Sequence, residues 1–208
     1  MAGTAIQQMS CENFVRERGF DMSTQAATTS RPEPWLRGTH SEVPAVIRAV
    51  LHAFDLARED AVHWADDLSD AELHASPSGL APVSFHMRHI ARSLDRLLTY
   101  AEGNQLSSEQ LIAYKTELDP AVSREEILAE FHQGLEHAAE RVRAFAGADL
   151  EQPREVGKKQ LPTTVGGLLV HLADHTQRHT GQIVTTSKLL RNSRDGAGAA
   201  KTAVHGLS

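Results

Sequence analysis

Four long stretches of this 208-residue sequence place apolar residues three and four positions apart, and this repeat constrains the fold more than any other feature. The spacing is that of one apolar face of an α-helix, which must be buried against a partner. The stretches span residues 41–68, 82–101, 123–145 and 163–190. The sequence shows no strand pattern of useful length, internal repeat or glycine-rich phosphate loop. The pattern therefore predicts an all-α fold, a four-helix bundle.

Boundary signals support these helices. Capping boxes of the form Ser-x-x-Glu occur at residues 69–72 and 123–126, where each end would satisfy backbone N–H groups of the other. Pro82 suits the first turn of the second long helix. Between the long helices, residues 107–118 are expected to form a small connecting helix, and residues 155–159 a brief extended piece within a linker. The bundle is thus predicted to contain short connecting elements.

The apolar repeat also divides the chain. Residues 1–34 are polar and aperiodic, so we expect a flexible leader, within which Met22 is a plausible alternative start. Residues 35–191 form the predicted bundle domain. Residues 192–208 are rich in Gly, Ala and Ser and are expected to be a disordered tail. This organisation leaves one folded domain between two extensions.

Charge and composition exclude several classes of protein. The formal net charge of −6 comes without a cluster of Lys or Arg, which argues against nucleic acid as a partner. The sequence contains no run of 18 or more apolar residues, the length that a membrane-spanning helix needs. The single cysteine, Cys11, cannot form an internal disulfide, so a reducing cytoplasm is the expected location. We therefore expect a cytoplasmic protein that acts on a small molecule.

The fourth stretch contains an unusual set of histidines, His171, His175 and His179, at intervals of four residues. Residues four apart lie one helical turn apart on the same face, about 6 Å along the axis. His175 and His179 take places in the apolar repeat, where a polar side chain needs a strong partner, and two such imidazoles can share one metal ion. His171 flanks the repeat. The histidines off the repeat of the first helix, His52 and His63, are expected at the surface.

The kinds of metal site compatible with this pair are few. A metalloprotease would carry H-E-x-x-H, but residues 175–179 read H-T-Q-R-H. One cysteine rules out thiolate clusters, and a di-iron carboxylate site would need Glu-x-x-His on two helices. A mononuclear, all-nitrogen site remains, with a third imidazole from the second helix. The helical wheel favours His86 over His89 for that position. Three imidazoles suit Zn²⁺, Ni²⁺ or Fe²⁺ and leave a coordination position open.

Two motifs taken together resemble the DinB/YfiT-like superfamily. They are Arg88-His89-Ile90-Ala91 on the second helix and His175-x-x-x-His179-Thr180-Gly181-Gln182-Ile183 on the fourth. The resemblance implies a four-helix bundle with up-down-down-up order and a metal site formed by His89, His175 and His179. We expect His86 and His171 to be secondary partners of the ligands or to line a cavity, because metal-bound imidazoles need an acceptor for their other nitrogen. We expect Asp174 or Asp95 to accept hydrogen bonds from the ligands.

The resemblance further implies two kinds of enzyme. One is a metal-dependent hydrolase, and the other a transferase or isomerase that uses bacillithiol, mycothiol or glutathione as a co-substrate. In both, a metal ion lowers the pKa of a bound water or thiol. An enzyme of this kind should have a cavity beside the metal, lined by the first and second helices. The alternative is a non-catalytic metal-binding or oligomerisation bundle, and a homodimer is possible in either case.

Overall fold

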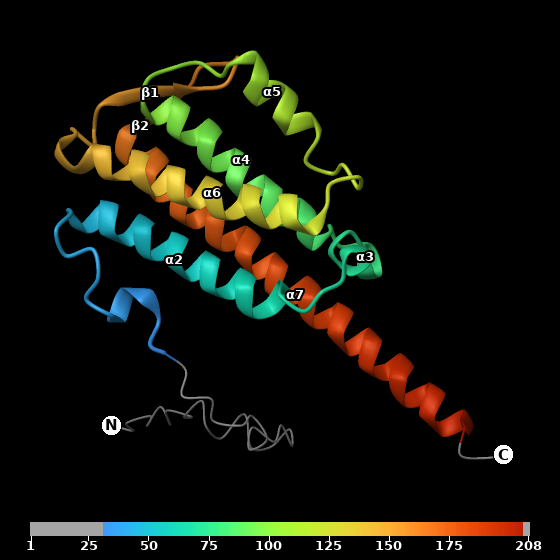
Figure 1. Cartoon of the computed structure of the whole chain (residues 1–208). Helices are drawn as coiled ribbons and strands as arrows, with labels where there is room; N and C mark the ends of the chain where they lie inside the picture. The colour runs from blue at the N-terminus through green and yellow to red at the C-terminus, as the bar shows by residue number, and fades with distance from the viewer. Residues whose placement is uncertain (1–30, 206–208) are drawn as a thin grey trace, which may run out of the picture. The chain divides into compact units, whose positions relative to one another are not determined.

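The computed structural model describes residues 31–205, with side chains described up to residue 195. From Glu33 onward these residues belong to one compact unit, which is drawn in colour in Figure 1. Almost all of the predicted leader, including Met22 and Cys11, lies outside the described residues.

Six helices and one small hairpin make up this unit. The helices are α2 (Ala45–Ala65), α3 (Asp70–Leu73), α4 (Val83–Ala101), α5 (Ser108–Lys115), α6 (Arg124–Arg143) and α7 (Val165–His205). Short 3-10 turns lie at Pro34–Leu36, Pro77–Gly79 and Ala144–Gly147. The antiparallel hairpin pairs β1 (Pro153–Val156) with β2 (Leu161–Thr164), so that Val156 lies opposite Leu161. The prediction of an all-α bundle is confirmed, with the hairpin as a minor addition.

Capping residues set the beginnings of three helices. The predicted boxes are present at Ser69, where the hydroxyl accepts from the backbone N–H of Glu72, and at Ser123, where it accepts from Glu126. A third box, with Ser107 and Gln110, begins α5. Each box satisfies two backbone donors that a helix otherwise leaves free. These local signals fix where the connecting elements start.

The four long helices follow the expected up-down-down-up order (Figure 1). Helices α4 and α6 run in the same direction, because Arg88 pairs with Glu130 near the beginning of both and Asp95 pairs with Arg141 further along. Helix α7 runs opposite to α4, since His86 near the start of α4 contacts His179 well along α7. The apolar faces of all four helices meet in a common core.

That core consists of the residues whose periodicity predicted the helices. The largest fully buried side chains are Phe54, Phe131, Ile47, Leu51, Leu73, Met87, Ile90, Leu94, Leu98, Ile127, Leu135 and Leu169. All of them except Leu73 of α3 come from the four long helices, so burial of the faces of these helices holds the bundle together.

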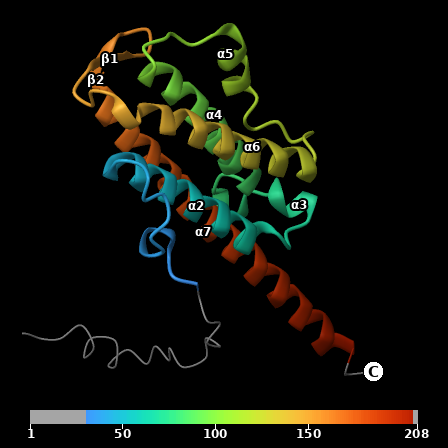
Figure 2. The same cartoon turned by 60° about the vertical axis from the view of Figure 1, so that its left-hand side comes forward.

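The parallel arrangement of α4 and α6 has a consequence for the connection between them. Two parallel neighbours need a connection that travels back along the bundle, and residues 102–123 make this return. Helix α5 lies in this crossover, beside α4, where the Gln110 amide donates to Asp95 and Thr99 (Figure 2). The crossover then passes back over α4 towards the start of α6. It therefore covers the part of α4 that carries the histidine motif.

Helix α7 is longer than expected. The sequence predicted a disordered tail from Asn192, but the helix continues to His205, so this prediction is wrong for residues 192–205. Arg191 and Arg194 both donate to the carboxylate of Asp67, at 2.5 and 2.8 Å, which holds this end of the helix against the chain that follows α2. The alanines of this segment also favour a helix. They do so without the apolar spacing of three and four from which the other helices were predicted.

The linker before α7 is likewise more ordered than its sequence indicated. The linker forms a hairpin over residues 153–164; of the expected extended piece at residues 155–159, only the first two residues are in a strand, and the rest belong to the turn, where Gly157 and Gln160 have positive φ. Strands of only four residues are too short for an alternation of apolar and polar residues to be recognised in the sequence.

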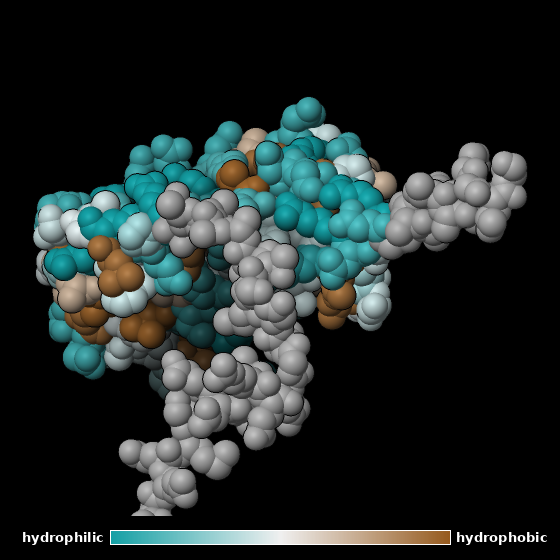
Figure 3. Space-filling view, turned by 90° about the horizontal axis from the view of Figure 1, so that it is seen from below, coloured by the Kyte–Doolittle hydropathy of each residue, from teal (hydrophilic) through white to brown (hydrophobic). Residues whose placement is uncertain are grey.

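The surface shows mixed hydropathy. On the face drawn in Figure 3, hydrophilic regions surround separate hydrophobic patches. Large exposed apolar side chains include Trp35 and Leu36 in the first 3-10 turn. Within the described residues, no helix has a stretch that is both long and apolar enough to span a membrane.

Close contact between α4 and α6 gives a stability prediction. A Cβ atom added at Gly134 would lie 2.6 Å from the Cβ of Ala91 and 2.9 Å from its Cα. We expect Gly134→Ala to lower the free energy of unfolding by roughly 1 to 2 kcal/mol, because overpacking outweighs the gain in helix propensity. Gly181→Ala is the control, since nothing lies within 4 Å of its added Cβ. It should raise that free energy by about 0.5 to 1 kcal/mol. Urea unfolding measures both, and equal effects would contradict the contact.

Candidate metal centre

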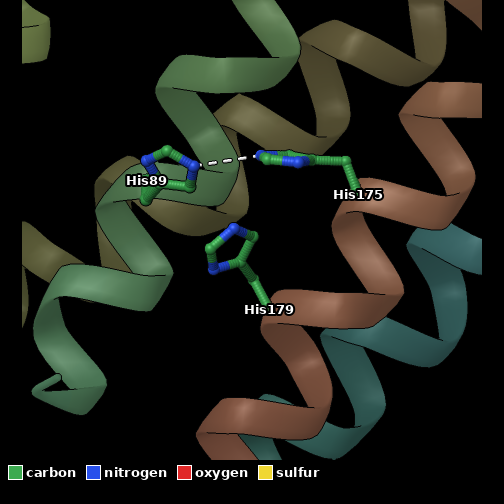
Figure 4. A group of neighbouring side chains, drawn as sticks. All are labelled: His89, His175 and His179. Atoms are coloured by element: carbon green, nitrogen blue, oxygen red, sulfur yellow. Dashed lines mark hydrogen bonds between the residues drawn. The ribbon is translucent and has the colours of Figure 1, made fainter. Parts of the chain in front are cut away.

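Three histidines from two helices meet inside the bundle. His89 comes from α4, and His175 and His179 come from α7. One nitrogen of each ring lies within 4.8 Å of the other two, and the three rings point towards one another (Figure 4). The Nε2 atoms of His89 and His175 are 3.0 Å apart and share a hydrogen bond. Two ring nitrogens this close need a proton or a cation between them.

His175 and His179 lie on the same side of α7, as residues four apart in a helix do, but the most buried positions of this part of the helix belong to other residues. Thr176 and Thr180 are fully buried, and the Thr180 hydroxyl donates to the carbonyl of Thr176. His175 and His179, which were expected at fully buried positions of the apolar repeat, lie beside these threonines and are only half-buried. The small threonines take the buried positions, so the larger imidazoles turn to the side that faces His89.

Burial keeps the two α7 imidazoles neutral. It lowers the pKa of His175 to about 4, assisted by the neighbouring His179 and His89. Burial likewise lowers the pKa of His179 to about 4, with His89 and Arg178 as further causes. A neutral imidazole has a free nitrogen lone pair, which is the form that binds a metal. At neutral pH both rings are therefore ready to act as ligands.

A buried carboxylate orients His89. Its Nδ1 atom donates to Oε2 of Glu117 at 2.7 Å, and only 4% of the Glu117 side chain is exposed. Arg96 donates to the other oxygen, Oε1, at 2.9 Å. Burial alone would raise the pKa of Glu117, but the bonds from His89 and Arg96 outweigh it and lower that pKa. With the proton held on Nδ1, the Nε2 lone pair of His89 faces the other two histidines.

His86 has a secondary position. Its Nδ1 lies 3.0 Å from Nδ1 of His179, so one of these nitrogens donates to the other and leaves Nε2 of His179 for the centre of the cluster. Burial lowers the pKa of His86 to about 4, with the charges of His179 and His89 adding to the effect. The helical wheel favoured His86 as the third member, but the structure brings His89 to that position.

His171 and the two aspartates that were expected near the ligands have different positions in the structure. His171 lines the cavity described below, and Asp174 lies 3.8 Å from its Nδ1. Asp95 is wrong as an acceptor for a ligand, because its carboxylate binds Arg141 and Gln110 on the far side of α4. It lies about one and two-thirds turns beyond His89, which places it roughly 120° around the helix from that residue and away from the cluster.

His52 also differs from its prediction. It was expected at the surface, but only 7% of it is exposed, and its Nε2 contacts the hydroxyl and the carbonyl of Thr39. The turn at residues 37–43 covers this part of α2, which the periodicity of α2 alone does not show.

A cavity of about 340 Å³ adjoins the cluster. His89 and His175 lie in its wall, together with Arg96, Tyr100 and Tyr114. Its walls come from α4, α5 and α7, so the expectation is confirmed for the second long helix, α4, and wrong for the first, α2, which contributes no residue to the described wall. The difference arises because the crossover between the parallel helices α4 and α6 brings α5 over this side of α4.

Sequence reasoning missed two participants, Glu117 and Phe85. Glu117 follows α5 in an irregular segment, where no periodicity assigns a facing direction. Phe85 lies on α4 with its ring stacked on that of His89, at a centroid distance of 5.3 Å. The one available signal for Phe85 was its i, i+4 spacing from His89, which places the two rings on the same face.

The donor set fits a divalent metal ion. Three Zn–N bonds of about 2.0–2.1 Å in a tetrahedral site place the nitrogens roughly 3.3 Å apart. One pair of nitrogens, those of His89 and His175, is 3.0 Å apart and all three lie within 4.8 Å of one another, so ring rotations would bring them to this spacing. Three imidazoles without an acidic ligand also leave at least one position for another molecule.

Comparison with known proteins adds a family. A sequence model described as the DinB superfamily matches residues 53–183. The match covers more than half of the chain and includes all three histidines of the cluster. No curated protein matches the chain.

Proposed function

Because the chain belongs to the DinB superfamily and brings three imidazoles together, we propose that it is a metal-dependent enzyme. His89, His175 and His179 hold one divalent ion, either Zn²⁺, Ni²⁺ or Fe²⁺. The reaction is a hydrolysis or the transfer of a low-molecular-weight thiol to a small-molecule substrate.

One observation favours a catalytic metal site over a purely structural one. Two of the three proposed ligands, His89 and His175, lie in the wall of a cavity of about 340 Å³. Structural sites are usually closed by four protein ligands, whereas catalytic sites keep one position for a substrate. Here the open side of the cluster faces a space of the size of a small-molecule site.

The chemistry divides between the ion and the chain. When bound, a divalent ion supplies a Lewis acid that lowers the pKa of a coordinated water or thiol. Glu117 keeps the proton of His89 on Nδ1, so this ring presents a lone pair in a fixed direction. The apolar side chains in the cavity wall lower the local dielectric beside the cluster and so strengthen its electrostatic interactions.

Activity assays with a matched variant test this proposal. Protein loaded with each of the three metals is assayed for hydrolysis of an aryl acetate, and for conjugation of glutathione, bacillithiol or mycothiol to a chloronitroaromatic electrophile. We expect one of these reactions to require metal and to be lost in His175→Ala. If neither reaction depends on metal, and bound metal has four protein ligands, the chain is a non-catalytic metal-binding bundle and the proposal is wrong.

A further inference from the structure

The cavity beside the histidine cluster has a largely apolar wall. Leu97 and Tyr100 contribute from α4, Leu106 from the connection to α5, and Leu111 and Tyr114 from α5 itself. A volume of about 340 Å³ is within the range of small-molecule sites. Apolar side chains favour a ligand whose body is hydrocarbon, aliphatic or aromatic.

One ionised group interrupts this wall. Among the described residues that line the cavity, Arg96 is the one Lys or Arg, and none is Asp or Glu. The guanidinium is held in place, because Nη1 donates to Glu117 and the group lies over the Tyr114 ring, 4.9 Å from its centroid. Only 13% of the side chain is exposed. Arg96 is therefore a fixed positive group at the edge of an apolar space.

The guanidinium keeps unused donors. Within the described part of the chain, Nε and Nη2 of Arg96 make no hydrogen bond, while Nη1 binds Glu117. Glu117 has both of its oxygens occupied, one by Arg96 and one by His89, and it lies behind the cavity wall. A planar guanidinium with two free donors matches the two oxygens of a carboxylate.

We propose that this cavity binds an organic carboxylate, with its carboxylate on Arg96 and its apolar body among the leucine and tyrosine side chains. The group that reacts then lies beside His89 and His175, which belong to the same wall. This assignment rests on the proposed function for the reaction, because it names the substrate class of that site. Binding itself needs only Arg96 and the apolar wall.

A matched pair of probes tests the assignment. Phenylbutyrate and phenylbutyramide have the same apolar body and differ in charge. Isothermal titration of the full chain, metal-free and zinc-loaded, should show the carboxylate binding roughly tenfold more tightly than the amide in both forms. Equal affinities for the two probes, or no binding of either, would overturn the proposal.

Variants assign the preference to one side chain. Arg96→Gln should reduce the preference for the carboxylate to less than about threefold. Arg141→Gln is the matched control, since Arg141 is an ion-paired arginine of similar exposure that does not line the cavity. It should keep the full preference, and loss of preference in both variants would contradict a specific role for Arg96.

A third variant locates the binding. Leu97→Trp, on a rigid helix, should fill the cavity and abolish binding of both probes while the far-UV circular dichroism spectrum stays unchanged. Binding that survives in this variant places the probes elsewhere. Zinc titration of the same samples separates the two claims: if zinc binds but the probes do not, only this inference fails. If the carboxylate binds at Arg96 and zinc does not bind, the proposed function fails instead.

Discussion

Replacing His175 by alanine is expected to weaken binding of one divalent ion by on the order of 100-fold. The Nε2 atom of His175 lies 3.0 Å from that of His89, so the substitution removes one of three nitrogens that converge on the same point. The remaining two ligands bind the ion less tightly and leave two or more of its coordination positions to solvent. Competition with a chromophoric zinc chelator measures the change.

His171→Ala is the matched control for this experiment. His171 lies one turn earlier on α7, with its ring centroid 5.4 Å from that of His175, and it lines the same cavity. It is not one of the three clustered histidines, so zinc affinity should change by less than about threefold. If the two variants lose zinc equally, the ligand assignment on α7 is wrong.

A second large effect is expected at Glu117. Its carboxylate accepts the Nδ1 proton of His89 and is almost completely buried. Glu117→Gln keeps the size of the side chain but removes the charge that holds this tautomer, and zinc affinity should fall by roughly 10- to 100-fold. Zinc competition measures this loss. The absorption spectrum of the cobalt-substituted protein should also shift, because the His89 ring is no longer held in one orientation.

Glu130→Gln tests whether loss of any ion-paired carboxylate near α4 would also weaken zinc binding. Glu130 accepts from Arg88 and Arg92 on that helix and contacts no imidazole. We expect this variant to lose stability but to bind zinc with nearly the affinity of the wild type. Equal weakening in both variants would mean that Glu117 acts through general stability, and its role as the orienting partner of His89 would be withdrawn.

Local patterns in the sequence were sufficient for the architecture. The long helices were predictable because burial of one face requires the spacing of three and four that α2, α4, α6 and the first part of α7 display. Ser69 and Ser123 carry their capping signals within four residues. The continuation of α7 past Asn192 was not predictable, since its contacts with Asp67 come from more than 120 residues away.

The site was predictable only in part. His175 and His179 stand four apart in one helix, so helical geometry alone pairs them. The choice between His86 and His89 was not decided by periodicity, because α4 packs against both α6 and α7 and its buried arc is wider than one stripe. The resemblance to a family supplied His89. Glu117 depends on the path of the crossover over α4, which no local pattern encodes.

The central claim is that His89, His175 and His179 bind one ion and leave a position open to the cavity. X-ray absorption spectroscopy of the zinc-loaded full chain, with the metal content measured on the same sample, tests it most directly. We predict one zinc ion per chain with three imidazole nitrogens at about 2.0–2.1 Å and at least one ligand that is not from the protein. A zinc ion held by four protein ligands, or a chain that binds no zinc at these histidines, would contradict the account.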